Sequence, residues 1–308
     1  MKNFTFLEKE RCCEYAFLNN GPYWHIATPG ALTEIIFTCA DDYRFGMTLM
    51  AESTFACGVR VYNFELMSNH LHIIGSAQKQ QCTDTLDYCR RRLVRMARLG
   101  GRTLSLDSFV SDPLPIDTLD SLRNNIVYVS RNGFVVNSAH TPYSYPWGSG
   151  HLLFGPPLYH LGAKPYSELF ARDQRILTRS RSISFPSSYT VRDGYITPES
   201  FVDYRTGMSF FRDAHQYFQA LTKNIESYSE FAGRFGDMIV LTDEEMYSAA
   251  ASISRKQYNQ ERPLVLPHQE KLQLAKELHF KYNATNGQIN RILKIGLDVL
   301  QELFPKAQ

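Results

Sequence analysis

The chain has 308 residues, of which 44% are hydrophobic and 21% are charged, and its formal net charge is +2. This composition excludes a disordered or fibrous chain, and the length predicts one large domain or two to three small ones. Residues 1–4 do not begin a continuous apolar segment, and no run of about 18 apolar residues follows. We therefore expect neither a signal peptide nor a membrane span.

The cysteines indicate a reducing compartment. They form no Cys-x-x-Cys pair, and three of them fall in predicted helices. We interpret them as reduced thiols that serve as small apolar residues, which predicts a cytoplasmic protein. The six are Cys12, Cys13, Cys39, Cys57, Cys82 and Cys89.

The first part of the chain alternates predicted strands and helices. Alternating apolar residues indicate the strands, and apolar residues three or four positions apart indicate the helices. The two strands on either side of Ser68-Asn69 most simply pair antiparallel, because the break between them is short. In chain order we predict a strand at 23–28, a helix near 39–56, strands at 59–66 and 70–77, a helix from Thr83 or Asp84 to about Leu99, and a loop ended by Pro113 and Pro115.

The next predicted helix, residues 117–132, carries two polar side chains of interest. Tyr128 and Asn132 are one helical turn apart and lie off the apolar stripe, so both can face one point. We expect Gly133 to end this helix. The stripe consists of Leu119, Leu122, Ile126 and Val129.

The remaining chain is mainly helical and suggests three regions. A loop rich in Pro, Gly, Ser and Tyr at 140–155 marks the first boundary. We predict domains at residues 1–155, 156–238 and 239–308, with helices at 208–231, 267–282, 287–293 and 297–304. The two last helices, joined by a tight turn, fit a helix-turn-helix or an ordinary three-helix packing unit equally well.

His70 and His72 stand two residues apart in a predicted strand, so they share one face of the sheet. Spacing alone favours two ordinary histidines over a metal site. If the helix with Asn132 packs against that strand, its amide oxygen would be a third ligand. Two imidazoles and one carbonyl oxygen suit Mg²⁺ or Mn²⁺ acting with a phosphate, and the absence of a thiolate argues against structural zinc.

The chain resembles the Y1 transposases, which are HUH-type single-strand DNA transesterases, over about residues 20–155. The nearest branch is that of the REP-associated tyrosine transposases. That branch has a Pro-Asn-His-x-His strand, a Tyr-Ile-His-x-Asn-Pro helix end and a Tyr-Pro-Trp-Ser-Ser loop, in this order. The matching segments here are Trp24–Gly30, Met67–His72, Tyr128-Val-Ser-Arg-Asn132 and Tyr145-Pro-Trp-Gly-Ser149.

The resemblance implies a fold and a chemistry. It implies an α+β fold, with a ferredoxin-like antiparallel sheet and helices forming an HUH nuclease core, followed by a mainly helical C-terminal region. Tyr128 would attack the phosphorus and give a 5′-phosphotyrosine link and a free 3′-OH. His70, His72 and Asn132 would hold Mg²⁺ or Mn²⁺, which stabilises the developing charge. The substrate would be single-stranded or hairpin DNA, such as a REP-like palindrome.

Several positions depart from the family pattern. Ser68 replaces a proline, Ser130 a histidine and Gly133 a proline, and Gly148-Ser149-Gly150 replaces a Ser-Ser-Tyr-like segment. The nucleophile and ligand positions are kept. Tyr143 and Tyr145 are competing nucleophiles, although neither has an asparagine four residues further on.

Basic residues suggest how such a protein would hold DNA. Residues 89–102 contain six arginines and no acid, and a second basic cluster spans Arg172 to Arg181. Such patches bind phosphates or simply form a solvated helix face. We expect a monomer or homodimer that is associated with the nucleoid. The expected DNA contacts are Arg90, Arg91, Arg92, Arg95, Arg98, Arg123 and Arg131.

Two other functions are compatible with the same residues. One is a catalytically silent DNA-binding regulator derived from the same fold. The other is a metal-dependent hydrolase of small phosphoesters, whose turnover would survive loss of Tyr128.

Overall fold

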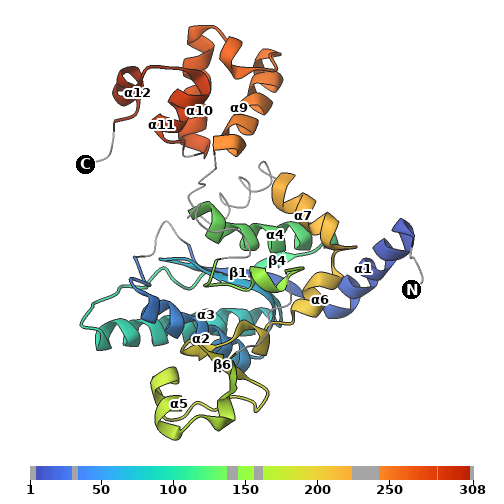
Figure 1. The fold of residues 1–308 in the computed structure, drawn as a ribbon, viewed down its shortest axis with the longest axis vertical. Helices are drawn as coiled ribbons and strands as arrows, with labels where there is room; N and C mark the ends of the chain where they lie inside the picture. Colours follow the sequence, from blue (N-terminus) through green and yellow to red (C-terminus); the bar gives the residue numbers. More distant parts are fainter. Residues whose placement is uncertain are drawn as a thin grey trace. The chain divides into compact units, whose positions relative to one another are not determined.

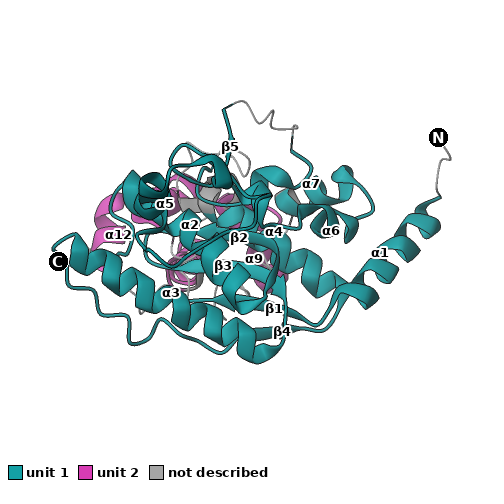
Figure 2. Ribbon diagram, turned by 90° about the horizontal axis from the view of Figure 1, so that it is seen from below, with its two compact units in different colours: residues 1–223 teal, residues 224–308 magenta. Residues whose placement is uncertain are grey.

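The computed structural model describes residues 5–29, 34–136, 145–155, 162–223, 243–282 and 284–305. The chain forms two compact units, residues 1–223 and residues 224–308 (Figure 2). The first boundary expected from the sequence, near residue 155, does not separate units, because residues 162–223 pack into the first one. None of the helices in the described ranges is long and apolar enough to cross a membrane.

The first unit is built on a four-stranded antiparallel sheet (Figure 1). Its strands run in the spatial order β2-β3-β1-β4 and are connected in the sequence β1-α2-β2-β3-α3-β4. The fold is therefore α+β, as expected. The elements are β1 (Tyr23–Ala27), α2 (Ala40–Cys57), β2 (Arg60–Leu66), β3 (Leu71–Ser76), α3 (Lys79–Leu99) and β4 (Leu114–Ile116).

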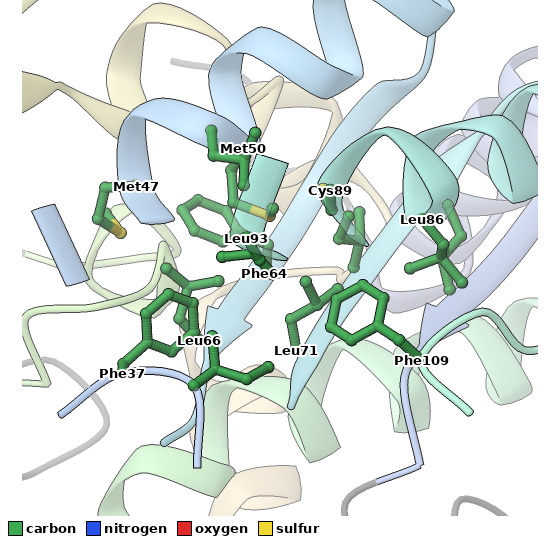
Figure 3. Packing of buried hydrophobic residues seen from close by; sticks show 14 of the residues in the cluster. Phe37, Met47, Met50, Phe64, Leu66, Leu71, Leu86, Cys89, Leu93 and Phe109 are labelled. Carbon is green, nitrogen blue, oxygen red and sulfur yellow. The ribbon is translucent and has the colours of Figure 1, made fainter. Parts of the chain in front are cut away.

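Helices α2 and α3 cover one face of this sheet, and an apolar core lies between them and the strands (Figures 1 and 3). Alternate strand residues such as Phe64, Leu71 and Ile73 enter that core. They pack against one apolar side of α3, formed by Leu86, Cys89, Leu93 and Met96 at helical spacing. The intervening strand residues, including His72, must then face the opposite side of the sheet.

Helix α4 (Leu119–Val136) packs on that opposite side, against β2 and β3. It is buried nearly all round from Ile126 to Asn132. Helices α1 and α7 also contact it, which explains why its polar face is enclosed. These flanking helices are α1 (Phe6–Asn20), α6 (Tyr204–Ser209) and α7 (Ala214–Lys223).

A small second sheet completes the first unit beside α2. Its strands pair antiparallel in the order β5-β6-β7, and its apolar residues pack against Ala51 of α2. Val202 forms a bridge with Val61 on the edge of β2, so this region is attached to the main sheet as well. The elements are β5 (Lys164–Pro165), α5 (Ala171–Thr178), β6 (Thr190–Arg192) and β7 (Tyr195–Ile196).

The second unit is a bundle of short helices. Asn290 of α11 donates to the carbonyl of Ile295, and Lys294 in the left-handed conformation turns the chain into α12. The three helices expected after residue 266 are all present, and helix α9 precedes them within the described part of this unit. The helices are α9 (Asp243–Tyr258), α10 (His268–Tyr282), α11 (Asn286–Leu293) and α12 (Leu297–Leu303).

Several element boundaries differ from those expected. Strand β3 begins at Leu71, so His70 precedes it, and helix α3 begins at Lys79, where Gln78 and Gln81 form a capping box. The segment expected as a proline loop contains β4, in which Pro115 is tolerated because β4 is an edge strand. Helix α4 continues past Gly133 to Val136. Parts of the predicted 140–155 loop and 208–231 helix lie outside the described residues.

Candidate active site

His70 and His72 lie side by side at the start of β3. Their ring centroids are 5.0 Å apart in an edge-to-face arrangement. His72 is fully buried, whereas His70 is half-buried and its Nδ1 lies 2.7 Å from Asn69 Oδ1. The two imidazoles therefore come together as expected, although His70 belongs to the turn before the strand.

A third histidine, His25, joins this pair from β1. Its Nε2 lies 2.9 Å from His72 Nδ1, and its Nδ1 lies 2.6 Å from Asn125 Oδ1 on α4. His25 is only 1% exposed. The sequence reasoning overlooked it, although a histidine in the middle of an otherwise apolar strand was a usable signal, since a buried polar side chain needs a partner.

Tyr128 packs directly on these histidines. Its ring centroid lies 5.5 Å from that of His72, edge to face, and 5.9 Å from that of His25. The contact joins α4 to β3 and β1, which are far apart from it in sequence. Tyr128 is 2% exposed, so it is enclosed in the fold although it lies off the apolar stripe of its helix.

Asn132 follows Tyr128 by one helical turn and is also buried. Glu65 lies across from His72 in the β2–β3 register and is 3% exposed, so a carboxylate that the sequence reasoning did not select accompanies the histidines. Within the described ranges, no three His, Cys, Asp or Glu side chains are arranged to hold a metal. Two imidazoles with an amide oxygen remain a donor set that fits Mn²⁺ or Mg²⁺.

Of the two competing tyrosines, Tyr145 lies within the described residues. Its hydroxyl donates to the carbonyl of Leu66 at 2.7 Å. Burial, followed by the nearby charge of Glu65, raises the pKa of Tyr145 well above its usual range, so the phenolate is strongly disfavoured. The other competitor, Tyr143, lies outside the described residues.

The loop that carries Trp147, Gly148 and Ser149 lies along the outer edge of β2. The amide of Leu66 donates to the carbonyl of Trp147, and the amide of Ser149 donates to the carbonyl of Phe64. Gly148 passes so close that a Cβ there would lie 2.9 Å from the Phe64 carbonyl oxygen. The departure at Gly148 therefore suits the way this loop approaches the strand.

Ser130 occupies a buried polar network rather than a reactive position. Its Oγ accepts from Asn63 Nδ2 at 2.8 Å and from the Tyr217 hydroxyl at 2.9 Å, and it donates to the carbonyl of Ile126. Ser149 Oγ donates to the Oδ1 of the same Asn63. Ser130 thus links β2, α4 and α7.

The structure contradicts part of the expected DNA contact set. Arg123 is 6% exposed and bonds to Glu10 and to the carbonyl of Phe210, and Arg131 is 2% exposed. Arg92 forms an ion pair with the buried Glu52. These guanidinium groups are therefore engaged or enclosed within the fold rather than presented on its surface.

The other arginines of the expected set lie on α3. Arg90 and Arg91 pair with Asp87, whereas Arg95 and Arg98 are exposed. Because α3 covers the face of the sheet opposite α4, these arginines and Tyr128 are on different sides of it (Figure 1).

Comparison with known proteins gave no match among protein-family models, curated proteins or solved structures. Any functional conclusion therefore depends on the residues and geometry described above.

Proposed function

We propose that the chain is a metal-dependent endonuclease and strand transferase for single-stranded or hairpin DNA, similar to the Y1 transposases. The observation that carries the proposal is the packing of Tyr128 on His72, which itself lies beside His70. The helix with Tyr128 and the strand with His72 are remote from each other in the sequence. A phosphotyrosine mechanism needs a tyrosine close to a metal-binding site, and the packing of the Tyr128 ring on His72 is consistent with that need.

The connectivity of the sheet supports the same proposal. A β-α-β-β-α-β unit with the strand order β2-β3-β1-β4 is the arrangement of ferredoxin-like folds. We propose that this sheet is the HUH core, with the two histidines at the start of one of its central strands. Fold alone does not define a function, so the site residues carry the weight.

The proposed reaction is a transesterification. The oxygen of Tyr128 forms a bond to phosphorus as the bond from phosphorus to the 3′ oxygen breaks. The tyrosine gives up its proton and the leaving 3′ oxygen takes one up, so a 5′-phosphotyrosine and a 3′-OH result. His70, His72 and Asn132 would hold Mg²⁺ or Mn²⁺. The bound ion would supply charge stabilisation at the phosphoryl oxygens.

A second candidate function is favoured by the burial of the site. His72, Tyr128 and Asn132 are each no more than 5% exposed, so a phosphate reaches them only if the site opens. A catalytically silent DNA-binding regulator needs no such opening.

The decisive experiment is incubation with a labelled single-stranded hairpin DNA and Mn²⁺, followed by denaturing electrophoresis. We expect a covalent protein–DNA adduct that Tyr128→Phe abolishes. Tyr145→Phe, which also removes one hydroxyl from a half-buried tyrosine, is the matched control and should retain the adduct. DNA binding without an adduct in any divalent metal would favour the regulator. Cleavage that survives Tyr128→Phe would favour the phosphoester hydrolase.

A further inference from the structure

We infer that His25, held by Asn125, is a positioning residue that fixes the ring tautomer of His72 and so directs His72 Nε2 toward a metal. This inference rests on the proposed function, because it gives His72 a ligand role. It adds two residues that neither the spacing nor the family resemblance assigned to the site. The evidence is a continuous chain of hydrogen bonds from α4 to β1 to β3, of which the two made by His25 are buried.

The chain begins at Ser121 on α4, which orients the Asn125 amide. Asn125 Nδ2 lies 2.7 Å from the carbonyl oxygen of Ser121. A carbonyl oxygen only accepts hydrogen bonds, so the amide nitrogen must face it and Asn125 Oδ1 must face His25. The two hydrogen-bond partners therefore determine that the oxygen of the Asn125 amide, and not its nitrogen, faces His25.

That orientation determines the protonation pattern of both imidazoles. Asn125 Oδ1 only accepts, so His25 Nδ1 carries the proton in the 2.6 Å contact between them. In a neutral His25 ring, Nε2 is then the acceptor. His72 Nδ1, at 2.9 Å, must donate to it. In a neutral His72 ring, the lone pair is consequently on Nε2.

The arrangement is the usual one for a metal-ligating histidine. Such a histidine commonly donates its second ring N–H to an outer acceptor, which fixes the tautomer and the ring orientation. His25 differs from the common carboxylate or carbonyl acceptor, but its neutral Nε2 performs the same function. His25 and His72 lie diagonally across the β1–β3 register, so two strands maintain the distance between the rings.

The side chains are also held against rotation. His25 and His72 are at most 1% exposed and Asn125 is 3% exposed, so solvent does not compete for these bonds. Tyr128 packs against both rings. The relay therefore positions the ligand next to the proposed nucleophile.

The first test reads the tautomers directly in the unmodified protein without metal. Long-range ¹H–¹⁵N correlation spectra distinguish the protonated from the unprotonated ring nitrogen of each histidine. In solution, we expect His25 and His72 both to carry the proton on Nδ1. A neutral His72 ring protonated on Nε2 would overturn the inference. Because the measurement uses the unmodified protein, this result does not depend on whether a variant folds.

The second test measures Mn²⁺ affinity by electron paramagnetic resonance in three variants. His25→Leu removes the acceptor and should weaken Mn²⁺ binding by about 10- to 100-fold, the usual effect of losing an outer-shell partner. His25→Gln places an amide oxygen near the former Nε2 and should restore binding to within a few-fold of wild type. His215→Leu, an exposed histidine on α7, is the matched control and should bind as wild type does.

The outcomes separate this inference from the proposed function. A wild-type protein that binds no Mn²⁺ removes the proposed metal site, and the inference with it. A wild-type protein that binds Mn²⁺, with His25→Leu binding equally well, leaves the proposed function intact and overturns the inference alone. Equal loss in His25→Leu and His25→Gln would show that His25 acts by packing rather than by accepting the His72 proton.

Discussion

Ser130 is the residue whose identity most affects the interior next to the site. Its Oγ accepts hydrogen bonds from Asn63 and Tyr217, both of which are fully buried. Ser130→Ala leaves both donors without this acceptor, so we expect a loss of about 1–3 kcal/mol in the free energy of unfolding. Urea unfolding measures this. Ser209→Ala, an exposed serine on α6, should change stability by less than about 0.5 kcal/mol. Equal midpoints for the two variants would contradict the network.

Glu10 and Arg123 form a second residue-level contact, and it depends on pH. The Arg123 guanidinium lies 2.8 Å from Glu10 Oε1 and holds the pKa of Glu10 below its usual value of about 4.5. When folding lowers the pKa of a carboxyl group, that group adds to the free energy of unfolding at pH values above its pKa in the unfolded chain. This contribution is lost as the pH falls through the lowered pKa.

We therefore expect Glu10→Gln to reduce the free energy of unfolding by about 1–3 kcal/mol at pH 7, because it leaves the buried Arg123 charge without this carboxylate. The difference from wild type should shrink as the pH falls below about 4.5. Urea titrations at pH 7, 5, 4 and 3 measure it. Glu14→Gln, an exposed position on the same helix, should show no such trend. A difference that stays constant down to pH 3 would contradict the ion pair.

At the level of elements, helix α3 has an apolar side and a basic side. One side packs into the core and the other presents Arg95 and Arg98 to solvent. Because α3 and Tyr128 are on opposite faces of the sheet, we expect these arginines to contribute to DNA affinity and not to the chemical step. Arg95→Glu and Arg98→Glu should each weaken DNA binding and reduce the slope of log affinity against log salt by about 0.7 to 0.9.

Fluorescence anisotropy with a labelled hairpin at several salt concentrations tests this expectation for α3. Adduct formation at saturating DNA should stay near the wild-type level. Arg11→Glu, an exposed arginine on α1, controls for the change in net charge. If α3 is only a solvated face, all three variants will have the same affinity and slope.

The elements also show which features local patterns can predict. Strands β1, β2 and β3 and helix α2 follow from alternation and periodicity, and their expected ranges agree with the structure to within a few residues. Strand β4 is not apparent from the local pattern because Pro113 precedes it and Pro115 lies within it, and it forms by pairing with β1. Helix α1 was also not predicted from the sequence, although Thr5 and Glu8 form a capping box at its start.

The site shows the same limit. The order of short motifs along the chain predicts four site residues, namely His70, His72, Tyr128 and Asn132. The structure brings Tyr128 onto His72. The contact of His25 with His72 depends on the diagonal register between two strands, which no short sequence window contains. The burial of Arg123 likewise depends on Glu10, which lies more than a hundred residues away.

For the whole molecule, the two compact units predict two cooperative transitions. The second unit has an apolar core of its own, which includes Leu274, Leu278, Ile289 and Leu300. Both tryptophans of the chain, Trp24 and Trp147, belong to the first unit, where the indole of Trp24 donates to the carbonyl of Ala77 and the Trp147 ring stacks on Tyr43. Tryptophan fluorescence therefore reports the unfolding of residues 1–223, whereas far-ultraviolet circular dichroism reports both units.

We expect urea unfolding followed by fluorescence to give a single transition, and circular dichroism to give a second one with a different midpoint. A chain that ends at residue 223 should keep the fluorescence transition and lose the other, because the tryptophan environment is formed within the first unit. A separate chain of residues 224–308 should be helical and unfold with the second midpoint. If both probes follow one coincident transition, or if truncation at 223 lowers the fluorescence midpoint, the two units depend on each other for stability.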